Sequence, residues 1–162
     1  MTVSYLSVET TVGRLWVAYD RGRVCFTRLS ADEQAFRAQC ERRLRTRVLP
    51  DEDASVRRAV ESRLENDTAL LFDLESCTPF QEAVLAKTAA IPRGEVRTYA
   101  QLAAAVGRPK AARAVGQVMR TNPIPVLIPC HRVVRSTGAL GNYSPRPELK
   151  HQLLLWEGAL QA

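Results

Sequence analysis

Residues 98–123, TYAQLAAAVGRPKAARAVGQVMRTNP, contain two helix-forming segments joined by a tight turn. Thr98 can cap the first helix together with Gln101, and Gly107 can end it. The turn GRPK leads into the second segment, AARAVGQVMRT, which Pro123 closes. Two helices joined by a short turn that contains glycine predict a helix-turn-helix in this half of the chain.

The second helix of the pair has two different faces. An apolar stripe at helical spacing consists of Val115, Val118 and Met119. A basic and polar face consists of Arg113, Gln117 and Arg120. Beside that face lies Gly116, which costs about 1 kcal/mol relative to alanine in a helix and therefore suggests close approach by a bulky partner. Either DNA or another helix would fit, so DNA binding and plain helix packing both stay open.

The amino-terminal half has the pattern of a small α/β unit. Three short alternating segments predict an antiparallel meander, and they cover residues 3–8, 13–19 and 23–28. Ser30 and Glu33 fit a capping box that opens a helix through about Arg45. A second helix is expected over residues 56–65, before an extended connection to the other half.

Further elements flank the helix-turn-helix. Thr78 caps a helix that runs to about Ala90. Residues 125–129, PVLIP, predict a short buried strand or extended segment, and residues 132–143 an irregular hairpin. A final helix is expected from Pro147 to Gly158.

The charge is divided unevenly between the two halves. Residues 1–76 carry 12 basic and 13 acidic side chains, whereas residues 77–162 carry 11 and 4. The formal charge of +6 therefore comes from the second half, which suggests a surface for a polyanion such as nucleic acid. A merely basic protein is the alternative. We expect two small domains, 1–76 and 77–162.

Composition excludes several other classes of protein. The longest apolar runs are far shorter than the roughly 18 residues of a membrane span, and no signal peptide is recognisable, so we expect a cytoplasmic protein with no membrane partner. The cysteines show no metal-ligand spacing, and they are Cys25, Cys40, Cys77 and Cys130. We expect free thiols, no metal site and no cofactor.

The stretch IPVLIPCHRVV, residues 124–134, places a cysteine between a proline and a histidine. A cysteine after an apolar run is most often an inert buried thiol. His131, however, can take the proton of Cys130, and Arg132 adds positive charge, so the composition is that of an activated thiolate. Protease, acyl transferase, redox sensor and alkyl acceptor all stay open from these residues. The basic helix just upstream favours chemistry on DNA.

These stretches resemble one known family. RGEVRTYAQLAAAVGRPKAARAVG, NPIPVLIPCHRVVRSTGALGNYS and LLLWEG are similar to the O6-alkylguanine-DNA alkyltransferases, also called methylated-DNA–protein-cysteine methyltransferases. The resemblance runs from about Thr78 to Gly158, and PCHRV is its most specific part. It implies an α/β (α+β) fold, with a ribonuclease-H-like amino-terminal lobe built on an antiparallel sheet and a winged-helix-like carboxy-terminal lobe that holds the helix-turn-helix.

The resemblance also implies a reaction. Cys130 would accept the alkyl group from O6-alkylguanine, and from O4-alkylthymine, in double-stranded DNA, and this single turnover would inactivate the protein. We expect a monomer located on nucleoid DNA, with cooperative binding along DNA as an open possibility. A damage-sensing DNA-binding protein without turnover is the alternative, which Cys130 disfavours. A winged-helix regulator and a cysteine hydrolase explain fewer of the motifs.

The same resemblance assigns catalytic roles to individual residues. His131 would withdraw the proton of Cys130 through a water, and Glu157 would orient the imidazole. Asn122 would brace the turn between the recognition helix and the segment that carries the cysteine. Tyr99 would act on the nucleotide once it is flipped out of the duplex.

Further residues are assigned to DNA and to the base pocket. Arg113 would fill the gap left in the base stack, and the implied DNA-binding residues are Thr98, Tyr99, Ala112, Arg113, Gly116, Gln117 and Arg120. The implied pocket residues are Met119, Pro125, Val133, Tyr143, Ser144 and Pro145. This chain departs from the family pattern at Gln117, where a glycine is common. It departs again at Pro145-Arg146-Pro147, where small residues are usual and where a stiffer lip would restrict the alkyl groups accepted.

Overall fold

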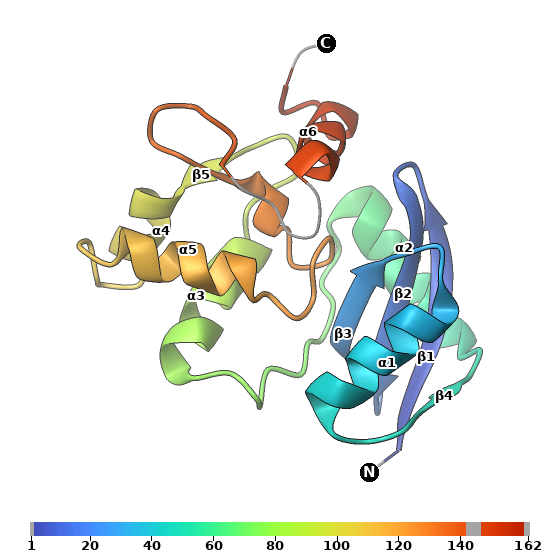
Figure 1. Ribbon diagram of the computed structural model, residues 1–162. Coiled ribbons are helices and arrows are strands. Elements are labelled where there is room, and N and C mark those ends of the chain that lie inside the picture. The colour runs from blue at the N-terminus through green and yellow to red at the C-terminus, as the bar shows by residue number, and fades with distance from the viewer. Residues whose placement is uncertain (1, 142–146, 161–162) are drawn as a thin grey trace. The chain divides into compact units, whose positions relative to one another are not determined.

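The computed structural model describes residues 2–141 and 147–160. The chain divides into two compact units, Met1–Asp73 and Leu74–Ala162. The division falls between Asp73 and Leu74, slightly before the boundary expected after residue 76. The fold is mixed α/β, as predicted, with a small sheet in the first unit and mainly helices in the second (Figure 1).

The first unit is built on a four-stranded sheet. The predicted meander is confirmed as β1 (Val3–Thr10), β2 (Gly13–Asp20) and β3 (Arg23–Leu29), paired antiparallel in that order. A fourth strand, β4 (Val48–Pro50), pairs parallel with β1 and forms the other edge, so the sheet order is β3-β2-β1-β4. An antiparallel sheet was expected, and three of the four strands form one. The edge strand β4 is parallel to β1, so the sheet as a whole is mixed.

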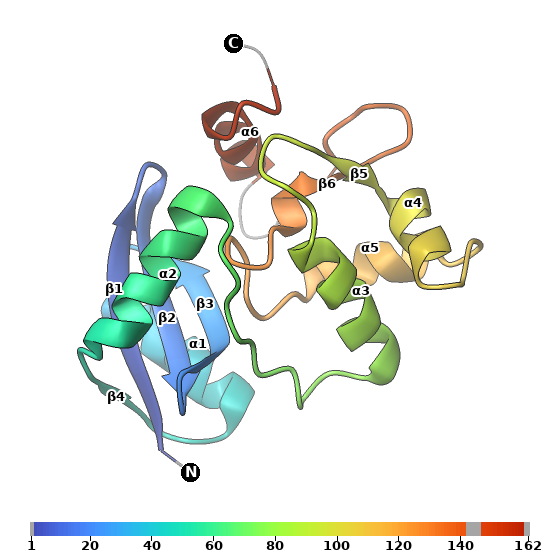
Figure 2. The ribbon, with the colours of Figure 1, turned by 180° about the vertical axis from the view of Figure 1, so that it is seen from behind.

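Two helices cover opposite faces of this sheet. Helix α1 (Glu33–Leu44) lies in front of it in Figure 1, and helix α2 (Ala54–Asn66) lies in front of it in the reverse view of Figure 2. The cap of α1 was predicted wrongly. Asp32, rather than Ser30, accepts the free amide hydrogens of the first turn, while the Ser30 hydroxyl accepts from the amide of Asp32. The helix therefore begins one residue after its aspartate cap.

The second unit holds the remaining elements. They are α3 (Pro79–Ala89), β5 (Arg97–Thr98), α4 (Tyr99–Ala105), α5 (Ala112–Arg120), the 3₁₀ turn η1 (Cys130–Arg132), β6 (Val133–Val134) and α6 (Pro147–Trp156). Both capping boxes predicted here are present, at Thr78 for α3 and at Thr98 for α4. Helices α4 and α5 form the predicted helix-turn-helix. Among the described residues no helix is long and apolar enough to span a membrane.

The segment before the cysteine is a buried turn and not a strand. The amide of Ile128 donates to the carbonyl of Ile124 at 2.9 Å, and Val126 adopts a left-handed φ of 73°. Pro125 and Pro129 have no amide hydrogen to give to a sheet, which explains why an apolar run failed to form a strand. Downstream, β6 pairs with β5 in parallel.

Candidate active site

Cys130 begins the turn η1 and is 5% exposed. Asn122, which follows α5, forms hydrogen bonds with both ends of the segment that leads to Cys130. Its amide nitrogen donates to the carbonyl of Ile128 at 3.0 Å, and its side-chain oxygen accepts from the amide of Ile124 at 2.9 Å. The amide of Cys130 donates to the same Ile128 carbonyl at 2.7 Å. Asn122 therefore links the end of α5 to the segment that carries the thiol, in the position expected of a brace.

His131 and Glu157 meet in the interior of the second unit. The Nε2 atom of His131 lies 2.9 Å from Oε1 of Glu157, and both side chains are almost completely buried. Burial lowers the pKa of His131, against the opposing effect of Glu157, so the imidazole is neutral at neutral pH. Burial alone would raise the pKa of Glu157, but the hydrogen bonds from His131 and Arg132 outweigh it and lower that pKa to about 2. His131 is therefore a neutral imidazole whose ring is oriented by the ionised carboxylate of Glu157.

Arg132 occupies a place that the sequence did not reveal. Its guanidinium holds both oxygens of Glu157, with Nε at 3.1 and 3.2 Å from them, and its Nη1 donates to the carbonyl of Ile91 at 2.6 Å. From the sequence, Arg132 is expected only to add positive charge near the thiol. Its contact with Glu157 joins the turn η1 to the end of α6, and its contact with Ile91 joins η1 to the loop after α3.

Lys150 is a second buried residue near Cys130 that the sequence motifs do not indicate. Its side chain is 1% exposed, and its Nζ donates to the carbonyl of Val133 at 2.5 Å. Burial lowers the pKa of Lys150 to about 8, although nearby Cys130 acts in the opposite direction. The available signal was helical spacing, because Lys150 lies on the same stripe of α6 as the buried Leu149, Leu153 and Leu154.

Tyr99 is the first residue of α4 and is half-buried beside the thiol. Burial raises its pKa, and the neighbouring Cys130 does the same, so the phenol keeps its proton at neutral pH. Lys150 Nζ lies 5.9 Å from the centre of the Tyr99 ring. Gly141 leaves room for the phenol, since a Cβ atom at that position would lie 3.0 Å from the Tyr99 hydroxyl. The structure thus brings Tyr99, Lys150 and Cys130 together.

The outer face of α5 is open. Arg113, Gln117 and Arg120 are exposed, while Val115, Val118 and Met119 are buried. A Cβ atom built on Gly116 meets no atom within 4 Å in the described structure. Packing of another described helix of the second unit therefore does not account for the glycine. Ala112 is partly exposed at the start of the same helix.

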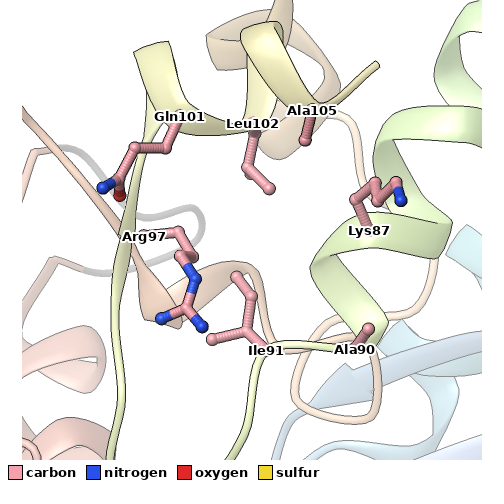
Figure 3. A pocket seen from close by; sticks show the side chains of 7 residues that line it. All are labelled: Lys87, Ala90, Ile91, Arg97, Gln101, Leu102 and Ala105. Carbon is pink, nitrogen blue, oxygen red and sulfur yellow. The ribbon is translucent and has the colours of Figure 1, made fainter.

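The predicted base pocket is described only in part. Met119, Pro125 and Val133 are buried, and the carbonyl of Val133 already accepts from Lys150. Tyr143, Ser144 and Pro145 lie outside the described residues. Thr98 is engaged in the cap of α4. A pocket of about 340 Å³ lies elsewhere in the unit, with Arg97 and Gln101 on one side and Lys87 on the other (Figure 3). None of the predicted pocket residues lines it.

Comparison with known proteins shows the family and the fold that this chain resembles. Residues 79–159 match the family described as 6-O-methylguanine DNA methyltransferase, DNA binding domain. The methylated-DNA–protein-cysteine methyltransferase of Homo sapiens is 65% identical over 65 residues, which make up 40% of this chain and 31% of the human protein. The chain thus spans about a third of the length of the mammalian relatives that it matches.

Other similar proteins match both units. The constitutive methylated-DNA–protein-cysteine methyltransferase of Bacillus subtilis (strain 168) is 35% identical over 93% of this chain and 92% of its own length. The crystal structure of Mycobacterium tuberculosis OGT in complex with DNA superposes with a TM-score of 0.77 at 27% identity, covering 98% of this chain and 94% of that one. The O6-methylguanine-DNA methyltransferase of Pyrococcus kodakaraensis strain KOD1 gives a TM-score of 0.74 at 25% identity, covering 96% and 99%. The predicted two-lobe fold is therefore confirmed.

Proposed function

Because the chain belongs to the methylated-DNA–protein-cysteine methyltransferase family, we propose that it repairs DNA by moving the alkyl group of O6-alkylguanine onto Cys130. The observation that carries this proposal is the buried Cys130–His131–Glu157 arrangement, tied through Asn122 to a helix with an open basic face. In this proposal Leu74–Ala162 contains the DNA-binding and acceptor residues.

The proton of the thiol moves first. Since Glu157 engages Nε2 of His131, the nitrogen that exchanges a proton with Cys130 is Nδ1, directly or through a water. Because burial lowers the pKa of His131, the imidazole is unprotonated before the reaction and has a free site for the proton. Glu157 and Arg132 hold the ring in place. In this proposal Cys130 is deprotonated only when the alkylated base is bound. The buried thiol is otherwise protonated and does not react with other electrophiles or oxidants.

The transfer is a single displacement. A new S–C bond forms as the bond between the alkyl carbon and O6 breaks, and the electron pair stays on the purine oxygen. The purine, left as an anion, takes up the proton that His131 received from the thiol, directly or through water, and this restores guanine. In this proposal the phenol of Tyr99, which its raised pKa keeps protonated, donates a hydrogen bond to the purine. The product on the protein is a thioether, which is a poor leaving group, so each molecule reacts once. We propose that O4-alkylthymine, which carries its alkyl group on the same kind of oxygen, reacts in the same way.

The damaged base has to leave the duplex to reach Cys130, because the thiol is buried. We propose that α5 enters the minor groove, with Ala112 and Gly116 against the backbone and Arg113 filling the vacated stack. Gln117 and Arg120 then contact phosphates. Binding is expected to be sensitive to salt and only weakly dependent on sequence.

The decisive experiment is incubation with a duplex that contains one O6-methylguanine, followed by intact mass and peptide mapping. One methyl group on the Cys130 peptide is expected, in stoichiometric amount and with no further turnover when substrate is in excess. The Cys130→Ala variant should bind the duplex with unchanged affinity and stay unmodified. Binding by the wild-type protein without any gain in mass would refute alkyl transfer and favour a damage sensor. A duplex with O4-methylthymine tests the second substrate.

We further propose that the protein acts as a monomer and is found with chromosomal DNA in the cell. Sedimentation with duplexes of increasing length measures the number of molecules bound per duplex. One molecule on a short duplex, with independent binding on longer ones, is the expected result. A steep rise in affinity with duplex length would instead demonstrate cooperative binding.

A further inference from the structure

Four arginines follow one another closely at the end of α1. The α1 arginine cluster consists of Arg42, Arg43, Arg45 and Arg47. All four side chains are exposed. None of their guanidinium groups forms an ion pair or hydrogen bond with another described residue. They are a third of the 12 basic residues in the first 76, a stretch whose net charge is slightly negative, so the positive charge is concentrated here.

The acids near the cluster are already engaged. Glu41, within α1, accepts from the amide of Val48 at 3.1 Å and lies 4.0 Å from Arg37. The next acids along the chain are equally occupied, with Asp51 accepting from the Tyr19 hydroxyl, Glu52 paired with Arg57, and Asp53 capping α2. The cluster therefore keeps its four positive charges uncompensated by local partners.

Stability of the helix does not account for all four arginines. Arg42 and Arg43 lie in the last turn of α1, where positive charge interacts favourably with the helix dipole. Arg45 and Arg47 lie beyond that turn, where the effect fades. Arg45 also adopts a left-handed φ of 54°, a position that glycine usually fills, whereas α2 ends in the same conformation with Asp67, a better tolerated residue. An arginine is thus kept where the backbone disfavours it.

We propose that the α1 arginine cluster is a second phosphate-binding surface for duplex DNA, located on the unit that does not carry Cys130. The proposal rests on the proposed function, which makes duplex DNA the substrate. Guanidinium groups can form bidentate hydrogen bonds with phosphate oxygens. A lipid surface is the less suitable partner, because the apolar residues of α1, Phe36 and Cys40, are buried in the unit and cannot enter a membrane.

The test is the salt dependence of binding to an undamaged 24-base-pair duplex by the full chain. In Arg43→Gln/Arg47→Gln, the slope of the logarithm of the DNA association constant against the logarithm of the salt concentration should fall in magnitude by about 1 to 2. Each phosphate contact that is lost lowers the number of counterions released when DNA binds. Affinity at low salt should fall roughly tenfold. The matched control is Arg21→Gln/Arg58→Gln, which removes the same charge from two other exposed arginines of this unit. It should behave like the wild type.

A second readout separates this proposal from the first. Alkyl transfer from the free base O6-methylguanine requires no DNA, so its rate should be the same in the wild type and in both double variants. Equal salt slopes for the wild type and the cluster variant would overturn the proposal, and so would equal losses in the control. Loss of binding to phosphatidylglycerol vesicles, with an unchanged DNA slope, would assign the cluster to a membrane instead. Failure of the proposed function would be seen separately, as absence of alkylation in the wild type.

Discussion

Glu157 accepts hydrogen bonds from two buried side chains, the neutral His131 and the charged Arg132, and this sets the chemistry at the scale of single residues. One oxygen accepts from His131, and Arg132 holds both oxygens. Without Arg132, the carboxylate would face only the imidazole and would favour its protonated form. With Arg132 present, Glu157 orients the ring while the ring stays neutral. A carboxylate shared in this way can support proton withdrawal from Cys130 without creating a permanent imidazolium.

Substitution of Gly141 tests whether the backbone at this residue lies close to the side chain of Tyr99. Both Gly141 and Gly138 have a positive φ, of 77° and 86°, so alanine should cost roughly 1–3 kcal/mol of unfolding free energy at either position. Only at Gly141 would the new methyl group also press on the Tyr99 hydroxyl, at 3.0 Å. Gly141→Ala should therefore slow alkyl transfer from DNA several-fold more than Gly138→Ala does, as measured by single-turnover kinetics.

A double variant identifies the cause of the Gly141 effect. Removing the hydroxyl with Tyr99→Phe relieves the clash, so the difference between Gly141→Ala and Gly138→Ala should shrink in that background. If the difference persists unchanged, Tyr99 is not the group that the methyl displaces. Chemical denaturation of each variant shows how much of any effect comes from backbone strain alone.

At the scale of elements, local patterns decided which parts of the fold could be predicted. The caps at Thr78 and Thr98 depend on residues three positions apart, so the sequence reveals them directly. Strand β4 spans three residues and exists only because β1 lies beside it, and no local pattern indicates such a partner. Contacts of Arg132 and Lys150 also join distant segments, and these were missed for the same reason. The catalytic and DNA-binding residues come from three separate stretches that resemble one family, and their roles stay predictions.

Gly116 lowers the stability of helix α5, and its replacement can be tested at the scale of this element. Gly116→Ala should stabilise the protein by about 1 kcal/mol, since alanine favours helix and the methyl group enters open space. The same methyl group would lie between α5 and the DNA backbone, so affinity for duplex DNA should fall several-fold. Thermal unfolding and fluorescence anisotropy measure the two effects. An increase in stability with unchanged DNA affinity would show that DNA does not approach α5 at this residue.

At the scale of the whole molecule, the two units carry buried groups of opposite pH dependence. In the second unit the pKa values of His131 and Glu157 are lowered by folding. Their stabilising contributions are complete above the ordinary values and are lost as the pH falls, for His131 from about 6.5 and for Glu157 between about 4.5 and 2. The second unit should therefore lose stability in acid.

The first unit has the reverse behaviour. Burial raises the pKa of Cys25, Cys40, Tyr5 and Tyr19 to about 12. The unfolded chain ionises these groups from about pH 9 for the thiols and 10 for the phenols, whereas the folded unit holds them neutral. Their contribution is complete at lower pH and is lost as the pH rises towards 12. The first unit should therefore lose stability in alkali.

One tryptophan in each unit allows both trends to be measured in the intact chain. With 5-fluorotryptophan in place of both, the ¹⁹F NMR signals of Trp16 and Trp156 report the two units separately, and a Trp156→Phe variant assigns them. Urea midpoints followed at each pH should fall in acid for the Trp156 signal and in alkali for the Trp16 signal. Glu157→Gln should flatten the acid dependence of the Trp156 signal below about pH 4.5, because the titrating carboxyl is gone. Midpoints that move together at every pH would mean that the units unfold as one, and that the buried groups of each unit set the stability of both.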